Sequence, residues 1–277
     1  MNISTPHINS CIKFLGAIAL CVLVPHTAYS GAWTLQKGQV WSKLNLLAQS
    51  TSEHYSENGN VEEFPATYKS NQLFFDVFYG VNDRVDIGIQ IPYCGNKFID
   101  IASAVGLPEE NAKESGIGDL RGYTKINLVQ QAVVATLKLG FKAPIGEYRP
   151  APEAISVSEG QWDFDVIFQI GGSLYPAPMY ANIDLGIRLR QENETGYDPP
   201  EELIYNAEIG YSLTDKFLLA LKLEGLRGDD RRTTYVVPTV LIGLNQNLSF
   251  ETSMRMTISG RKAFAGNIWA VGISYQK

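Results

Sequence analysis

Apolar and polar residues alternate with a period of two through almost the whole chain after residue 38. Residues 85–91 read VDIGIQI, so apolar side chains fall at odd positions and Asp86, Gly88 and Gln90 fall between them. This alternation predicts β-strands with one apolar and one polar face. The weakest prediction is the strand 236–244, because Pro238 cannot donate to a strand ladder. The pattern predicts about twelve strands, an even number: 39–51, 72–79, 85–91, 120–128, 133–143, 162–174, 181–189, 203–213, 217–223, 236–244, 248–258 and 269–275.

The stretch GIGDLRGYTKINL, residues 116–128, has two readings. Gly116 and Gly118 resemble the start of a phosphate-binding glycine loop. Such a loop would lead into a helix with a period of 3.6 residues. The residues from Leu120 to Leu128 instead keep the period of two, which indicates a strand and argues against a nucleotide site.

Connections between the predicted strands alternate between short and long. Short turns at one end and long loops at the other are typical of outer-membrane barrels. We therefore predict an all-β fold, a transmembrane antiparallel up-and-down β-barrel of about 12 strands. The short turns are 80–84, 129–131, 175–179, 214–216 and 245–247, and the longer segments are 52–67, 94–116, 145–160, 192–201, 227–232 and 259–266.

Aromatic residues on the apolar face gather near both strand ends, as the two interfaces of a bilayer favour. Because a soluble sandwich has little use for outward aromatic rings, this sorting supports the barrel. The belt near the short turns comprises Tyr79, Tyr180, Tyr211, Phe217, Phe250 and Tyr275, and the belt near the long loops comprises Tyr93, Phe141, Trp162, Phe164, Tyr205 and Trp269.

The first thirty residues differ from the rest. Lys13 precedes an apolar run at 14–24, and the small residues Ala28 and Ser30 follow it. The run is about half as long as a membrane-spanning helix, so it indicates a cleaved signal peptide, residues 1–30, rather than an anchor or a buried helix. Residues 31–277 then form the barrel. Removing residues 1–30 leaves Cys94 as the sole cysteine, so we expect no internal disulfide.

The net charge is −6 and becomes −7 without Lys13, because residues 1–30 contain no acid. This mild acidity argues against nucleic acid as a partner and gives no support for a basic membrane-surface patch. The expected partners are outer-membrane lipid, the barrel assembly machinery and an unidentified small-molecule substrate.

The polar face of the strands carries many charges of both signs. In a narrow lumen they would form a salt-bridge network, since an unpaired buried charge is costly. The same charges are also compatible with a zwitterionic conduit, and both readings remain open. We expect Arg188 and Arg190 to pair with Asp163, Asp165 or Asp184. The nine acids are Asp76, Asp86, Asp119, Asp163, Asp165, Asp184, Glu208, Glu224 and Glu251, and the nine bases are Lys43, Arg121, Lys125, Lys138, Lys142, Arg188, Arg190, Lys222 and Arg255.

Catalytic chemistry has little support in the sequence. After residue 30 the one histidine is His54, in an acidic loop, and a serine–histidine device needs a placed serine partner. We expect His54 to be a solvent-exposed bystander, and we predict no catalytic residue, metal cluster or cofactor. Glu62/Glu63 and Asp229/Asp230 are candidate oxygen ligands for calcium in outer loops, although acidic loops are usually just solvated.

Three stretches, 116–128, VVATLKLGFKAPIG (133–146) and EGQWDFDVIFQIGGSLYP (159–176), resemble the outer-membrane transporter-like family named for the meta-pathway of phenol degradation. The resemblance implies uptake of hydrophobic or aromatic compounds and supplies no catalytic residues. Such barrels usually end on an aromatic residue, whereas here Tyr275 is followed by Gln276 and Lys277.

The resulting interpretation is a transporter or porin-like conduit in the outer membrane. The alternatives are a lipid-modifying barrel enzyme and a closed envelope scaffold. Residues 31–38 are too few to plug the barrel, so we expect any gate to come from the long loops, chiefly 94–116. There LPEENAKES could form a short helix behind Pro108.

Overall fold

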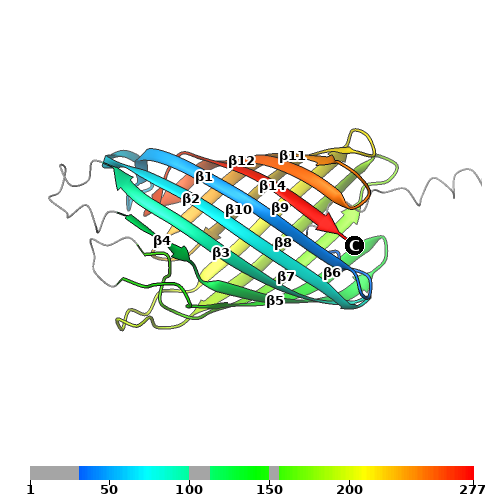
Figure 1. Ribbon diagram of the computed structural model, residues 1–277, viewed down its shortest axis with the longest axis horizontal. Helices are drawn as coiled ribbons and strands as arrows, with labels where there is room; N and C mark the ends of the chain where they lie inside the picture. The colour runs from blue at the N-terminus through cyan, green and yellow to red at the C-terminus, as the bar shows by residue number, and fades with distance from the viewer. Residues whose placement is uncertain (1–30, 100–112, 150–155) are drawn as a thin grey trace, which may run out of the picture.

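The computed structural model describes residues 31–99, 113–149 and 156–277, and they form a single β-barrel (Figure 1). Twelve long antiparallel strands close on themselves, because β1 pairs with both β2 and β14. The predicted all-β barrel of twelve strands is therefore confirmed. Two short strands are additional: β4 pairs with β3, and β13 pairs with β1.

The strand bounds extend several of the predicted elements. No helix in the described ranges is long and apolar enough to cross a membrane. The strands are β1 Val40–Tyr55, β2 Val61–Asn82, β3 Val85–Ile99, β4 Lys113–Ile117, β5 Leu120–Gln130, β6 Val133–Ala143, β7 Asp163–Ser173, β8 Met179–Arg190, β9 Glu202–Ser212, β10 Phe217–Arg227, β11 Arg232–Gly243, β12 Leu248–Arg261, β13 Ala263–Phe264 and β14 Asn267–Gln276.

The polar and apolar positions that alternate in the sequence face the lumen and the outer surface of the barrel, respectively. In β7, Asp163 is 1% exposed and points to the lumen, whereas the next residue, Phe164, is 41% exposed on the outer surface. Apolar side chains face outward because lipid, not water, surrounds the wall, and the lumen takes the polar positions. Pro238 lies within β11, opposite Leu221, so the weakest predicted strand is present despite the missing donor.

The two ends of the barrel differ as expected, but the described residues of two of the long connections include strand. The predicted loop 52–67 is a hairpin in which only residues 56–60 form the turn. The segment 94–116 begins as β3 and ends as β4, and residues 100–112 lie outside the described ranges. The helix expected at 107–115 falls partly on those residues, and residues 113–115 belong to β4. The signal peptide prediction, residues 1–30, also lies outside the described part of the chain.

Glycines on the inner face receive aromatic rings from the neighbouring strand. A Cβ atom at Gly88 would lie 2.5 Å from the ring of Phe78, and one at Gly210 would collide with the ring of Tyr180. These glycines therefore make room for large side chains that fill the lumen. Tyr180 was placed in the outer belt from the sequence, and that placement was wrong, because its ring lies inside against Gly210 and Leu218.

Candidate functional site

The segment before β1 enters the lumen from the short-turn end. Ala32 and Leu35 are 0% and 1% exposed. The amide of Ala32 donates to Asn182 Oδ1 over 2.9 Å, and its carbonyl accepts from the hydroxyl of Thr136. We expected residues 31–38 to be too few to plug the barrel; the structure shows that residues 31–35 nonetheless enter the lumen and fill part of it. Eight extended residues reach about 26 Å, which is enough to fill much of a narrow lumen.

Two charged side chains of the wall bind the backbone of this segment. Lys125 Nζ lies 2.8 Å from the carbonyl oxygen of Gly31 and 2.5 Å from that of Trp33. The carboxylate of Asp86 accepts from the amide of Leu35 through both oxygens, at 3.0 and 3.1 Å. The ammonium group donates to two backbone carbonyls and the carboxylate accepts from one amide. These contacts satisfy hydrogen-bonding groups of the extended backbone that no neighbouring strand pairs with.

The inserted segment fills one side of the lumen and leaves the other more open. Its contacts come from β3, β5, β6 and β8. On the opposite wall, Lys43 pairs with Glu251 at 2.9 Å, and Arg255 pairs with Glu224 at 2.8 Å. Their side chains keep 15%, 20%, 37% and 25% exposure, so this wall, from β10 through β14 to β1, is in contact with solvent. We call it the open wall.

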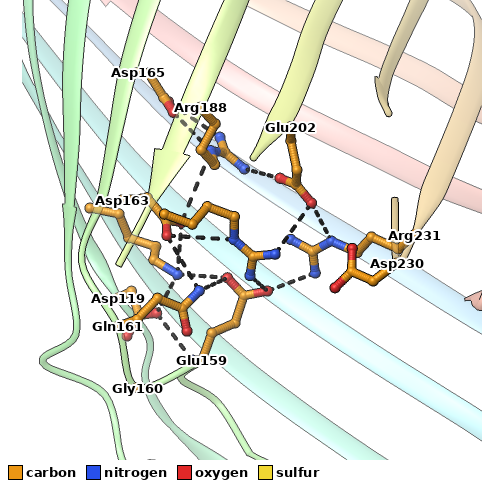
Figure 2. A network of polar contacts seen from close by, with 12 residues as sticks. Asp119, Glu159, Gly160, Gln161, Asp163, Asp165, Arg188, Glu202, Asp230 and Arg231 are labelled. Atoms are coloured by element: carbon orange, nitrogen blue, oxygen red, sulfur yellow. Dashed lines mark hydrogen bonds and ion pairs between the residues drawn. The ribbon is translucent and has the colours of Figure 1, made fainter. Parts of the chain in front are cut away.

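The long-loop half of the lumen holds a dense ion-pair network (Figure 2). Arg188 binds Asp165 at 2.8 Å and Glu202 at 3.3 Å, and Lys142 binds Asp163 at 2.9 Å. Such mutual pairing is what allows ionised groups to be buried. The buried charge cluster consists of Asp119, Lys142, Glu159, Asp163, Asp165, Arg188, Arg190, Glu202 and Arg231.

Three members of this cluster were missed from the sequence. Arg231 Nε lies 2.5 Å from Glu202, and its Nη1 lies 2.7 Å from Glu159. Glu159 and Arg231 belong to connections, where no period identifies a face. Glu202 directly precedes the predicted strand 203–213, and extending the alternation by one residue would have placed it inside. Burial opposes the ionisation of Glu159, but Arg231 and Lys142 outweigh it and hold the pKa of Glu159 well below its usual range.

The other lumen charges predicted from the sequence take several kinds of partner. The expected pairing of Arg188 and Arg190 with Asp163 or Asp165 is present, with Arg190 lying 3.7 Å from Asp163. Asp184 instead accepts from the amides of Asn182 and Asn206. The remaining contacts are Asp119–Lys142 at 3.4 Å, Arg121–Asp165 at 4.0 Å, Lys222–Glu208 at 3.4 Å and Lys138 over the ring of Tyr123 at 4.0 Å.

Aromatic side chains gather at the long-loop mouth, beside the open wall. We call this group the aromatic cluster, formed by His54, Phe64, Tyr68, Phe98 and Phe264. The rings of Tyr68 and Phe264 stack with centroids 4.0 Å apart, and Phe64 lies 5.3 Å from Phe98. Their side chains are only half-buried, although they are apolar and point to the same side as the lumen residues of β2 and β3.

His54 was expected to be a solvent-exposed bystander, and this was wrong. Its ring packs edge-on against Phe64 at 5.7 Å, and β13 brings Phe264 to the position opposite it. In the described part of the chain its shielded Nδ1 has no hydrogen-bond partner.

The short-turn end of the open wall contains a cavity of about 640 Å³. Trp41, Ser249 and Ser274 line it from the wall, with Lys216 and Lys277 at its rim. Its lining includes the small residues Gly243, Ser249 and Ser274, which leave this space. The open wall therefore runs between the aromatic cluster at one end and this cavity at the other.

The structure gives no support for calcium at the acidic pairs Glu62/Glu63 and Asp229/Asp230. Among residues 31–99, 113–149 and 156–277, no group of three His, Cys, Asp or Glu side chains is arranged to hold a metal ion. Asp230 accepts a hydrogen bond from the hydroxyl of Tyr197 over 3.0 Å.

Comparisons with known proteins agree with the barrel. The family model described as the putative MetA-pathway of phenol degradation matches residues 36–273. The COG4313 outer membrane channel from Pseudomonas putida F1 superposes with a TM-score of 0.76 at 14% identity, over 89% of this chain and 98% of that one. The KdgM and NanC porins give TM-scores of 0.52 and 0.53 at 5% and 8% identity, over 84% of this chain and 98% of each. No curated protein matches the sequence. At these identities the structures show the fold, which is that of outer-membrane barrels.

Proposed function

The chain belongs to the family described as the putative MetA-pathway of phenol degradation, and on that premise we propose that it is an outer-membrane conduit for small aromatic or otherwise hydrophobic compounds. Its export would use the signal peptide 1–30, and its insertion the barrel assembly machinery. The similar structure from Pseudomonas putida is that of an outer membrane channel, which supports a role in passage.

The observation that carries the substrate class is the aromatic cluster. Half-buried apolar rings on the inner side of a charged barrel mouth would be better placed in a packed core if their role were only structural. Tyr68 is held in position by a hydrogen bond from its hydroxyl to Asn96 Oδ1 over 3.2 Å, so its ring face is fixed. A planar apolar solute gains by contact with such ring faces, with offset or edge-on geometry.

A path for the solute follows the open wall. From the aromatic cluster it passes the Arg255–Glu224 and Lys43–Glu251 pairs and ends in the cavity beside Trp41. These ion pairs are internally neutralised, so they present little net charge to a neutral solute. The inserted segment lies across the lumen from this path, which makes its displacement the natural means of widening the conduit.

Two alternatives remain as competing functions. A lipid-modifying enzyme would need His54 beside a nucleophile, and its contacts here are with Phe64 and Phe264. A closed scaffold would be consistent with the inserted segment. It would not explain the cavity or the half-buried rings of the aromatic cluster.

The test is solute entry into liposomes that carry the refolded protein. A neutral aromatic, a small aromatic acid and a sugar of similar size would be compared in wild type, Tyr68→Ala and the control Tyr211→Ala, which removes an outer ring at the short-turn end. We expect the aromatics to enter faster than the sugar, and Tyr68→Ala alone to lower that preference. Equal entry of all three would contradict the substrate class. No entry through a folded barrel would favour the scaffold or the enzyme, which His54→Ala and an assay of lipid hydrolysis would then separate.

A further inference from the structure

Two rows of cations lie on the outer surface at the long-loop end, and strand register creates both. In the first, Arg227 of β10 is directly opposite Arg232 of β11, which is directly opposite Arg261 of β12. In the second, Lys69 of β2 is opposite Lys97 of β3, which is opposite Lys113 of β4. Directly paired residues project from the same face of a sheet, so each row is a line of three like charges.

The arginine row lies on the lipid-facing side of the wall. Pairing between β10 and β11 is regular from Phe217 to Arg227, so Arg227 shares a face with Leu223, which is 40% exposed. The ring of Tyr205 lies over Gly225 on this same face, and its hydroxyl is 2.6 Å from that of Thr234. Arg227 is two residues farther toward the long-loop end than Gly225, over which the ring of Tyr205 lies. Tyrosine favours the membrane interface, so the arginine row lies at the height of the lipid headgroups.

The lysine row has the same height. Lys69 lies four residues before Leu73 and Lys97 four residues after Tyr93, so in the regular β2–β3 ladder this pair lies four residues nearer the long-loop end than the outward pair Leu73 and Tyr93. Arg227 likewise follows Leu223 by four residues. Four residues of a tilted strand rise by about 10 Å, which carries both rows from the apolar band into the headgroup layer. Around the barrel the rows flank β14 and β1, the strands that close it.

Among the acids of the described residues, Glu57 is near enough to Arg261 for their charges to interact, but no acid is in ion-pair contact with either row. None of the six cations forms an ion pair there, and the shielded Nε atoms of Arg232 and Arg261 have no hydrogen-bond partner. Glu57, at the nearby hairpin turn, binds Lys262 at 2.8 Å. Like charges directly opposite one another destabilise a sheet, and two such rows call for an external anion.

We propose that the two rows bind phosphate groups of lipid headgroups in the outer leaflet. Arginine donates to phosphate in a bidentate fork, and a line of three cations at headgroup height matches a lipid bearing more than one phosphate. The net charge of −6 does not indicate these two cationic rows. The acids lie mainly in the lumen and the loops, whereas the six cations lie on the outer surface. The proposal is independent of what the lumen carries.

The test is lipid retention by the full barrel. The refolded protein would be extracted from phosphatidylcholine vesicles containing a diphosphorylated or a monophosphorylated glycolipid, and the bound lipid counted by native mass spectrometry. The variants are Arg227→Gln/Arg232→Gln/Arg261→Gln and Lys69→Gln/Lys97→Gln/Lys113→Gln. The control, Lys37→Gln/Arg84→Gln/Lys216→Gln, removes three cations at the opposite end.

We expect wild type and control to retain the diphosphorylated lipid, and each triple variant to bind it about tenfold more weakly or worse. Unchanged retention in both variants, or an equal loss in the control, would overturn the proposal. Displacement of the lipid by inorganic phosphate at millimolar concentration would show a free-anion site instead. Heat-modifiable gel mobility verifies folding, and if a triple variant does not fold, Arg232→Gln alone must show a weaker form of the same loss.

Discussion

The ammonium group of Lys125 lies 2.5 Å from the carbonyl oxygen of Trp33, and this contact ties the barrel wall to the segment that occupies the lumen. With Lys125 also on the carbonyl of Gly31, and Asp86 on the amide of Leu35, one cation and one anion hold an extended strand of backbone in place. If the barrel is the proposed conduit, its permeability should depend on the position of this segment.

Displacing the segment should open the conduit. Ala32 is fully buried between Asn182 and Thr136, so Ala32→Arg cannot keep its position. We expect a several-fold rise in single-channel conductance in planar bilayers. The control is Lys37→Arg, at an exposed position where the segment has already left the lumen. Equal conductance of Ala32→Arg and wild type would mean that current already bypasses the segment.

Filling the cavity should close its end of the path. Ser274 lines the cavity, whereas its neighbour Ile273 is 49% exposed on the lipid side. Ser274→Trp is expected to reduce both conductance and entry of aromatic solutes, because the added indole narrows the space beside Trp41. Ile273→Trp adds the same ring on the outer face and should leave both unchanged. If the two variants behave alike, the solute path does not use this cavity.

Removing one acid from the buried charge cluster should destabilise the barrel. Glu202 is 0% exposed and faces Arg188, Arg190 and Arg231. Glu202→Gln leaves these guanidinium groups with one counter-charge fewer, at a cost of about 3–5 kcal/mol. Urea unfolding in vesicles, followed by tryptophan fluorescence, measures the loss. The exposed neighbour Glu201→Gln should change stability little, and an equal effect of the two variants would argue against the network.

Lowering the pH should remove the stabilisation that ionised Glu159 gives to the folded barrel only below about pH 4. Arg231 and Lys142 lower its pKa in the folded state below the ordinary value of about 4.3, despite the opposing effect of burial. A lowered folded pKa means that the stabilisation is complete above the unfolded value and is lost as pH falls through the folded one. The difference in unfolding temperature between wild type and Glu159→Gln should thus be constant from pH 7 to about pH 5 and shrink below about pH 4. A difference that vanished already at pH 6 would contradict this assignment.

Much of the lumen could be assigned from alternation alone. Asp163, Asp165 and Arg188 lie inside because they alternate with outward Phe164, Val166 and Leu189, and a strand has only two faces. Glu159 and Arg231 could not be assigned in this way, because residues in connections obey no period. Tyr180 was misplaced because an aromatic residue near a strand end was read by its type and height, whereas its position in β8 turns it inward.

The sequence by itself determined that this chain forms a barrel, which face of each regular strand meets lipid, and which end bears the short turns. These are local properties: a period of two fixes the faces, and lipid requires the outer one to be apolar. Only the tertiary structure decided the path of residues 31–36, since an extended segment without a period carries no signal of what it contacts. Register likewise brought Arg227, Arg232 and Arg261 into one row and set Phe264 opposite His54. Such neighbours depend on how strands far apart in the sequence align, and alternation along each strand contains no information about that alignment.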